Sequence, residues 1–206
     1  MSIEIKISKK PVEYTKAITF LEKRLIKLKN NKATELVWIL EHPKIYTGGI
    51  SYRNYEVLDK NIKIINTNRG GKITWHGPGQ TICYFVIDLS KRNKDIRKFV
   101  LNLEKIIIKT LKEYKIKSFP DRKNIGIWVN HKNKIKKVSA IGIKVKNWIA
   151  YHGFSINIKN DLKYYEKIVP CGIINREVIN LTNIKYQKYN FIHKKIIKNF
   201  IKYLKV

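Results

Sequence analysis

The chain has 206 residues, of which 44% are hydrophobic and 11% aromatic. This composition excludes an intrinsically disordered chain and is typical of one globular domain with a sizeable core. No stretch is apolar and long enough for a signal peptide or a membrane span, so we expect a soluble, cytoplasmic protein with no membrane partner.

The formal net charge of +29 raises nucleic-acid binding as a function, because clustered cations gain affinity by releasing counterions from phosphates. The lysines are instead spread from Lys6 to Lys205 and accompany many isoleucines and asparagines. That distribution favours a compositional bias, and a basic nucleic-acid-binding protein stays a distant alternative. An acidic protein partner would be attracted by the same field.

Hydrophobic periodicity predicts helices and strands along the whole chain. In chain order they are helix 14–28, strands 35–40, 62–65 and 81–89, helix 99–114, strands 126–129, 138–145 and 148–158, and helix 192–204. Lys146 and Asn147 separate the last two strands and predict a tight hairpin. We therefore expect an α+β fold, a mixed sheet with flanking helices, whose strand order the pattern does not give. No repeat or linker divides the chain, so residues 1–206 are expected to form a single catalytic domain.

Residues 69–80 form the densest cluster of unusual residues, with four glycines, a proline, Arg69 and His76 between two apolar runs. Glycines let a backbone approach a ligand closely, Arg69 can bind an acidic or carbonyl group, and His76 can transfer protons. The spacing fits neither a P-loop nor a dinucleotide fingerprint. An ordinary glycine-rich turn is the alternative, which the length of the whole segment disfavours.

The two cysteines are too few for a disulfide framework and lack the spacing of metal ligands. Cys83 lies inside an apolar run and is expected to be buried. Cys171 stands between Pro170 and Gly172, which predicts a thiol presented on a shaped loop. Most cysteines are small buried apolar residues, so a nucleophilic role for Cys171 needs a neighbouring cation to lower the pKa of its thiol.

Lys137 is one candidate for that cation, because it begins the apolar run 138–143 and could be held at a strand edge. The alternative is that Lys137 ends a solvated cluster with Lys134 and Lys136. The residues alone favour the solvated cluster.

The motifs together resemble one known family, the lipoyl(octanoyl) transferases, which share a fold superfamily with the biotin and lipoate protein ligases. The family's motif Arg-Gly-Gly-x-x-Thr-aromatic-His-Gly-Pro-Gly-Gln is similar to residues 69–80, with Trp75 where tyrosine is usual. Other segments agree in order and spacing: Glu41-His42-Pro43, Tyr46-Thr47-Gly48-Gly49, Gly126-Ile127-Trp128-Val129, Lys137-Val138-Ser139-Ala140-Ile141-Gly142, His152-Gly153 and Pro170-Cys171-Gly172.

The resemblance implies roles for individual residues. It implies that Cys171 is the nucleophile that forms an acyl thioester, and that Lys137 lowers the pKa of that thiol, which reverses the preference for a solvated cluster. It also implies a substrate-binding wall made of Arg69, Gly70, Gly71, Lys72, Ile73, Thr74, Trp75, His76, Ala140, Ile141, Gly142, Gly153, Phe154 and Ser155, with Tyr14, His42 and Tyr84 as supporting polar residues.

The activity that the resemblance implies is an acyl transfer in lipoate biosynthesis. An octanoyl group would pass from octanoyl-acyl carrier protein through Cys171 to a lysine ε-amine on lipoyl domains of 2-oxoacid dehydrogenase complexes and on the glycine cleavage H protein, with Lys137 accepting the amine's proton. No nucleotide, metal or redox cofactor is implied, and we expect a monomer. The enzyme alternative is an ATP-dependent lipoate or biotin protein ligase on the same scaffold, which would need no cysteine nucleophile.

Overall fold

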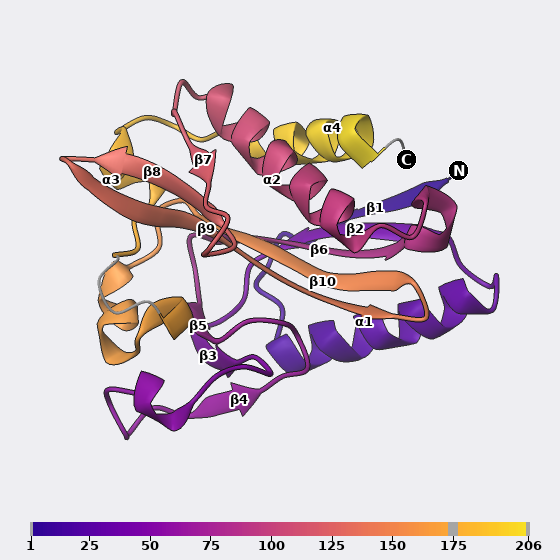
Figure 1. The fold of residues 1–206 in the computed structure, drawn as a ribbon, viewed down its shortest axis with the longest axis horizontal. Coiled ribbons are helices and arrows are strands. Elements are labelled where there is room, and N and C mark those ends of the chain that lie inside the picture. The colour runs from indigo at the N-terminus through magenta and orange to yellow at the C-terminus, as the bar shows by residue number, and fades with distance from the viewer. Residues whose placement is uncertain (1, 173–176, 205–206) are drawn as a thin grey trace.

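The fold combines two β-sheets with helices, and the computed structural model describes residues 2–172 and 177–204 (Figure 1). Within these ranges, the larger sheet has seven strands, and all neighbours are antiparallel except the parallel pair β1 and β2. From edge to edge the order is β1 (Ile3–Ile7), β2 (Glu35–Leu40), β6 (Gln80–Asp88), β10 (Ile149–Asn157), β9 (Lys134–Lys146), β8 (Ile127–His131) and β7 (Phe119–Pro120).

Helices cover both faces of this sheet (Figure 1). The helix α1 (Tyr14–Lys29) packs on one face, whereas α2 (Ile96–Lys112) and α4 (Ile192–Leu204) pack together on the other. A short helix α3 (Leu181–Ile184) precedes α4. Within the described ranges, none of the helices combines the length and the apolar character that crossing a bilayer requires.

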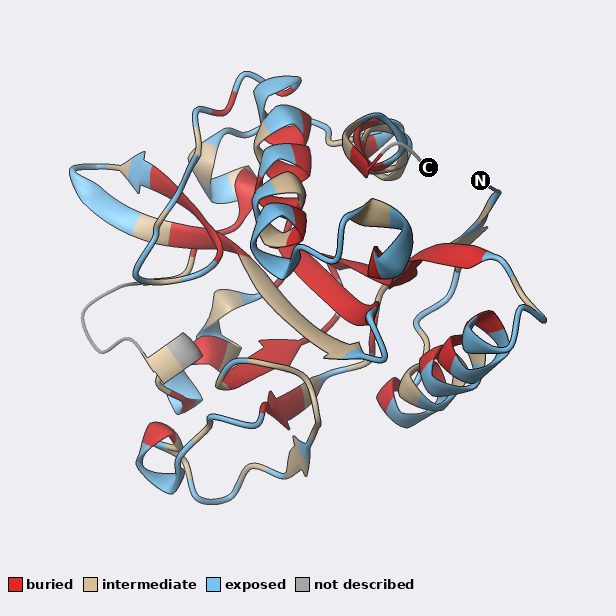
Figure 2. Cartoon of the chain, turned by 45° about the vertical axis from the view of Figure 1, so that its right-hand side comes forward, coloured by how far each residue is buried: buried red, intermediate tan, exposed pale blue. Residues whose placement is uncertain are grey.

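The central strands are buried on both faces, which explains why they read as continuous apolar runs. In β2, Leu36 and Trp38 pack toward α1, while Val37 and Ile39 pack toward α2 and α4. The same alternation holds in β6, because successive side chains of a strand point to opposite faces. Figure 2 shows these buried positions in red along the sheet and on the helix sides that meet it.

The smaller sheet carries the glycine-rich segment. Its order is β4 (Ile64–Asn66), β3 (Ile45–Gly48) and β5 (Ile73–His76), with β3 parallel to β4 and antiparallel to β5. Its apolar residues form a separate core cluster with Tyr165 and Ile168 from the segment that precedes Cys171. The segment 69–72 therefore leads directly into the buried strand β5, and the chain before Cys171 packs against β5.

The predicted α+β fold, a mixed sheet with flanking helices, is confirmed, and all three predicted helices are present. The predicted hairpin also forms, but its turn is Asn147–Trp148 and not Lys146–Asn147, since Lys146 still pairs with Ile149. Both turn residues have positive φ, 51° and 62°, the conformation of a two-residue turn that suits the twist of the strands. The strands β1, β3, β5 and β7 were not predicted.

Candidate active site

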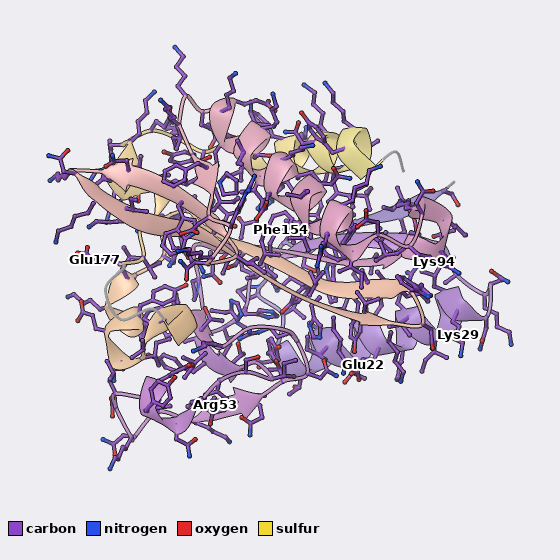
Figure 3. The ribbon with its side chains drawn as sticks, viewed as in Figure 1. Glu22, Lys29, Arg53, Lys94, Phe154 and Glu177 are labelled. Atoms are coloured by element: carbon purple, nitrogen blue, oxygen red, sulfur yellow. The ribbon has the colours of Figure 1, made fainter. Side chains whose placement is uncertain are left out.

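A cavity of about 520 Å³ lies where the segment 69–72 crosses the strands β9 and β10. Apolar side chains from β6, α2, β9 and β10 form much of its wall. One of them is Phe154 of β10, which packs in the core between the sheet and α2 and is labelled in Figure 3. Several basic side chains line it as well: Arg69, Lys72, Lys123 and Lys137. An apolar pocket with cations at its wall suits an alkyl chain attached to a reactive polar group.

Backbone contacts fix the segment 69–72 over the cavity. The amide of Gly70 donates to the carbonyl of Ile143 on β9 at 3.0 Å. Gly71 has φ of +89°, which favours glycine. The guanidinium of Arg69 donates to the carbonyl and hydroxyl of Thr47, both at 2.9 Å, and so ties this segment to β3. Arg69 thus helps to shape the cavity wall.

Lys137 is held inside the cavity wall and not in a solvated cluster. Lys137 is only 6% exposed. Its ammonium donates a hydrogen bond to the carbonyl of Ile125 at 3.0 Å and lies 4.9 Å from the ring centroid of Trp128. Lys134 and Lys136 instead form ion pairs with Glu177. Neighbouring positions of β9 thus place lysines in different environments, because side chains alternate along a strand.

The backbone of Cys171 belongs to a 3-10 helix, η4 (Pro170–Gly172). Gly172 lines the same cavity as Lys137 and has φ of +66°. The side chain of Cys171 and residues 173–176 lie outside the described residues. Glu177, the next described residue, contacts Lys137: the backbone amide of Lys137 donates to the carbonyl of Glu177 at 2.9 Å.

Cys83 has the surroundings expected from its apolar run. It lies on β6, is 0% exposed and packs in the core between the sheet and α2. Burial raises the pKa of the Cys83 thiol far above its ordinary range, so this sulfur stays protonated at neutral pH.

A chain of amides fixes the tautomer of His76. The Nδ2 of Asn157 donates to the carbonyl of Ile179, which leaves its Oδ1 to accept from Nε2 of Gln80 at 2.8 Å. Oε1 of Gln80 therefore accepts, and Nδ1 of His76 donates to it at 2.7 Å. Burial lowers the pKa of His76 to about 3. His76 lines the cavity as a neutral ring whose Nε2 is an acceptor.

A second buried histidine stands behind the cavity wall. Nδ1 of His42 donates to the carbonyl of Val12 at 2.6 Å, so its Nε2 accepts from the hydroxyl of Tyr84 at 2.9 Å. Burial lowers the pKa of His42 to about 4. The ring of Tyr14 lies 5.3 Å from His42 and 6.3 Å from His76. These aromatic side chains form one contiguous buried group.

His152 completes the set of buried histidines. Its Nε2 lies 2.7 Å from Oδ1 of Asn68, whose own amide nitrogen donates to Glu22, so Nε2 is the donor. Burial, followed by the charges of Arg69 and Lys144, lowers the pKa of His152 to about 3.

Most of the predicted site residues come together around this one cavity. Those that line it are Arg69, Gly70, Gly71, Lys72, Ile73, Thr74, His76, Tyr84, Lys137, Ala140, Ile141, Gly142, Gly153, Phe154 and Ser155. Among the described residues, Trp75, Tyr14 and His42 are placed outside this lining. Trp75 packs in the core of the small sheet, with its ring centroid 4.8 Å from that of Tyr164, whereas its neighbours Thr74 and His76 line the cavity.

Other lining residues escaped the sequence analysis: Ser51, Ile82, Val100, Lys123, Asn124, Ile125, Ile143 and Gly172. Val100 comes from α2 and Lys123–Ile125 from the irregular segment before β8. Gly172 belongs to the string Pro170-Cys171-Gly172, whereas none of the others stands out chemically in the sequence, so only the packing of the chain identifies them. His152 had a weak signal in the pair His152-Gly153.

Comparison with known proteins finds similarity over nearly the whole chain. A family model described as the lipoyl protein ligase A/B catalytic domain matches residues 13–205. An octanoyltransferase from Ehrlichia ruminantium (strain Gardel) is 43% identical over 199 residues, which cover 94% of this chain and 96% of that protein. An octanoyltransferase from Wolbachia pipientis wMel is 44% identical over 168 residues, which cover 81% of this chain and 82% of the relative.

Solved structures share the fold at low sequence identity. Lipoate-protein ligase A bound with ATP superposes with a TM-score of 0.74 at 14% identity, covering 100% of this chain and 86% of the other. A structure from an archaeal lipoylation system, described as a bi-partite lipoate protein ligase and its E2 lipoyl domain from Thermoplasma acidophilum, gives a TM-score of 0.73 at 11% identity and covers 100% of this chain and 84% of the other. Identities this low demonstrate a common fold alone.

Proposed function

The chain belongs to the lipoyl protein ligase A/B catalytic domain family, and from this membership we propose that it is an octanoyltransferase using a Cys171 thioester intermediate. Octanoyltransferases 43% and 44% identical to it support the activity. The observation that carries the catalytic assignment is the position of Lys137, buried at the wall of an apolar cavity that Gly172 also lines. We further propose that residues 1–206 act as one catalytic domain.

In the proposed first step, the thiolate of Cys171 attacks the carbonyl carbon of an octanoyl thioester. A bond forms between that carbon and the sulfur of Cys171, and the bond to the sulfur of the carrier breaks. The ammonium of Lys137 stabilises the thiolate of Cys171 before attack and gives a proton to the departing carrier thiolate, which leaves as a thiol. Lys137 is then a neutral amine beside the acyl-enzyme.

In the proposed second step, the neutral ε-amine of a target lysine attacks the thioester on Cys171. An amide bond forms, the bond between the acyl carbon and sulfur breaks, and the surplus proton of the amine passes to Lys137. This restores the thiolate and ammonium with which the cycle began. The hydrogen bond from Lys137 to the carbonyl of Ile125 supports this role, because it holds the side chain in one place in both steps.

The proposed donor is octanoyl-acyl carrier protein, and the proposed acceptors are lipoyl domains, including those of 2-oxoacid dehydrogenase complexes, and the glycine cleavage H protein. The E2 lipoyl domain named together with a ligase of the same fold supports an acceptor of this kind. Carrier proteins are acidic as a class, so the charge of +29 would speed their encounter with this chain. We propose that a cytoplasmic monomer carries out the reaction.

Mass spectrometry of a lipoyl domain tests the activity directly. Incubation with this chain and octanoyl-acyl carrier protein should add one octanoyl group to the domain, and the domain with its target lysine replaced by arginine should stay unmodified. A parallel reaction with free octanoate and ATP tests the ligase alternative. Modification in that reaction alone would contradict the proposed function.

A further inference from the structure

A buried carboxylate touches the turn that carries Cys171. Glu56 lies at the end of the 3-10 helix η1 (Asn54–Glu56) and is 0% exposed. Its Oε1 lies 2.8 Å from the ammonium of Lys72, whose side chain is 32% exposed. The Glu56 carboxylate raises the pKa of Lys72, mainly through a hydrogen bond, so Lys72 keeps its positive charge at neutral pH.

The backbone of Glu56 is bonded to the same turn. The amide of Val169 donates to the carbonyl of Glu56 at 2.7 Å, and the amide of Gly172 donates to the carbonyl of Val169 at 2.9 Å. The adjacent residues Val57 and Ile168 form an antiparallel β-bridge next to these bonds. Glu56 therefore anchors η4 from its N-terminal side.

The side chains of the pair fill the space beside Gly172. A Cβ at that position would overlap Cδ and Nζ of Lys72 and would lie 2.8 Å from Oε1 of Glu56. With its φ of +66°, this residue also requires the conformational freedom of glycine. The ion pair is thus packed directly against the residue that follows Cys171.

A carboxylate in this position has an electrostatic consequence for the sulfur. A negative charge close to a thiol disfavours the thiolate, and a positive charge favours it. A carboxylate packed against Gly172 would by itself oppose ionisation of the neighbouring Cys171, and the ammonium of Lys72 offsets that charge. Burial strengthens both effects, because water screens them less.

We propose that the Glu56–Lys72 ion pair positions the Cys171 turn, with Glu56 anchoring the turn and Lys72 neutralising the carboxylate that packs against Gly172. The inference rests on the proposed function, since it concerns how the proposed nucleophile is held. Neither residue is assigned a contact with the reacting atoms, and both act through the turn.

Several other elements also present charged or titratable groups to this turn and its cavity. They are Tyr55 from η1, Arg69 from the segment before β5, His76 from β5, Tyr84 from β6, Lys123 from the segment before β8, Lys137 from β9 and His152 from β10. None of these described groups is a carboxylate, so Glu56 supplies the carboxylate beside the turn. Removing its charge and removing that of Lys72 should therefore have opposite effects on the thiol.

The test measures the rate of Cys171 alkylation by iodoacetamide against pH in the full chain, with peptide mass spectrometry to separate Cys171 from Cys83. Lys72→Met should raise the midpoint of the thiol titration by about one unit, and Glu56→Gln should lower it by a similar amount. The double variant should return to the wild-type midpoint. A purely structural role would move both single variants in the same direction, and that result would overturn the proposal.

A second ion pair, between the chain just after η1 and the segment before Cys171, provides the matched control. Asp59 and Lys167 lie 2.9 Å apart, with 27% and 47% of their side chains exposed. Lys167→Met should keep the wild-type midpoint, and Lys72→Arg, which preserves the ion pair, should keep it as well. A Lys72→Arg midpoint as high as that of Lys72→Met would contradict the proposal. Full transfer activity in Cys171→Ala would instead refute the proposed function and leave the alkylation result standing.

Discussion

The ammonium of Lys137 donates a hydrogen bond to the carbonyl oxygen of Ile125 at 3.0 Å, from the strand β9 to the segment before β8. This bond holds the charge of a long, flexible side chain at one point of the cavity wall. A lysine free in solvent loses rotamer entropy when it must meet a reacting atom, and the bond removes much of that cost beforehand.

Replacing Lys137 by methionine should keep the packing against Trp128 and remove the charge. We expect the rate of acyl-enzyme formation to fall by about 10²- to 10⁴-fold, because the thiol then lacks both its cation and its proton donor. Rapid-quench measurement with an octanoyl thioester gives this rate. Lys136→Met is the matched control, since Lys136 pairs with Glu177, and it should retain the wild-type rate. Wild-type acylation by Lys137→Met would remove Lys137 from the mechanism.

Gly126 creates the space in which Lys137 lies. Its φ is +136°, and a Cβ there would lie 2.8 Å from Cε and 3.3 Å from Nζ of Lys137. Gly126→Ala should therefore displace the ammonium and slow acylation by about tenfold or more, which corresponds to at least about 1.4 kcal/mol. The same rapid-quench assay checks this, with circular dichroism as a control for folding. An unchanged acylation rate in the folded variant would show that the position of the ammonium does not matter.

Gly153 and Gly142 face each other on β10 and β9 and allow a matched comparison. A Cβ at Gly153 would overlap the carbonyl of Cys83 on β6, whereas one at Gly142 would lie 3.1 Å from the carbonyl of Gly70, a much milder contact. We expect Gly153→Ala to destabilise the fold by about 3 kcal/mol or more, and Gly142→Ala by about 1 kcal/mol. Urea denaturation measures both. Equal stability losses would contradict the close approach of β10 to β6.

The buried histidines predict how stability depends on pH. The pKa values of His42, His76 and His152 are lowered to about 4, 3 and 3 from the ordinary value of 6.5. Below 6.5 the unfolded chain binds more protons at these rings than the folded chain does. Their stabilisation is therefore complete above about pH 6.5 and is lost as pH falls toward 4 and 3, by about 1.4 kcal/mol per pH unit for each ring.

Urea denaturation of His42→Gln and of Tyr84→Phe between about pH 6 and about pH 4.5 tests this relation. His42→Gln removes one titrating ring and should reduce the slope of stability against pH by about 1.4 kcal/mol per unit. Tyr84→Phe removes the hydroxyl that donates to His42 but keeps all three rings, so it should lower stability with little change of slope. A wild-type slope in His42→Gln would show that this ring binds protons equally in the folded and unfolded chains, which would contradict its lowered pKa.

The sequence predicted the elements whose residues repeat regularly. The helices α1, α2 and α4 have clear apolar faces, and β2 and β6 are continuous apolar runs because both faces of the sheet are covered. The strands β3 and β5 were missed, since each has only four residues and glycine or histidine interrupts its pattern. Strand order was not predicted because pairing is set by contacts far apart in the chain.

The site was predicted where rare residues form a string, as in the segment 69–80, and missed where ordinary residues meet in space. Nothing in the sequence around Glu56 distinguishes it from an exposed glutamate of a loop, yet it is fully buried against Lys72. Lys137 illustrates the converse. The residues around Lys137 favoured a solvated lysine cluster when the sequence was considered alone. The alternation of side chains along β9 instead places Lys137 in the cavity wall, while Lys136 forms an ion pair with Glu177.

The formation of an octanoyl thioester on Cys171 tests the central claim most directly. After incubation with octanoyl-acyl carrier protein, peptide mass spectrometry should locate one octanoyl group on Cys171, and hydroxylamine, which cleaves thioesters, should remove it. Cys171→Ser should form no thioester, while Cys83→Ala should acylate normally, because the buried Cys83 thiol has a pKa far above neutrality. An octanoyl group found on Cys83 alone, or full octanoyl transfer by Cys171→Ala, would contradict the claim.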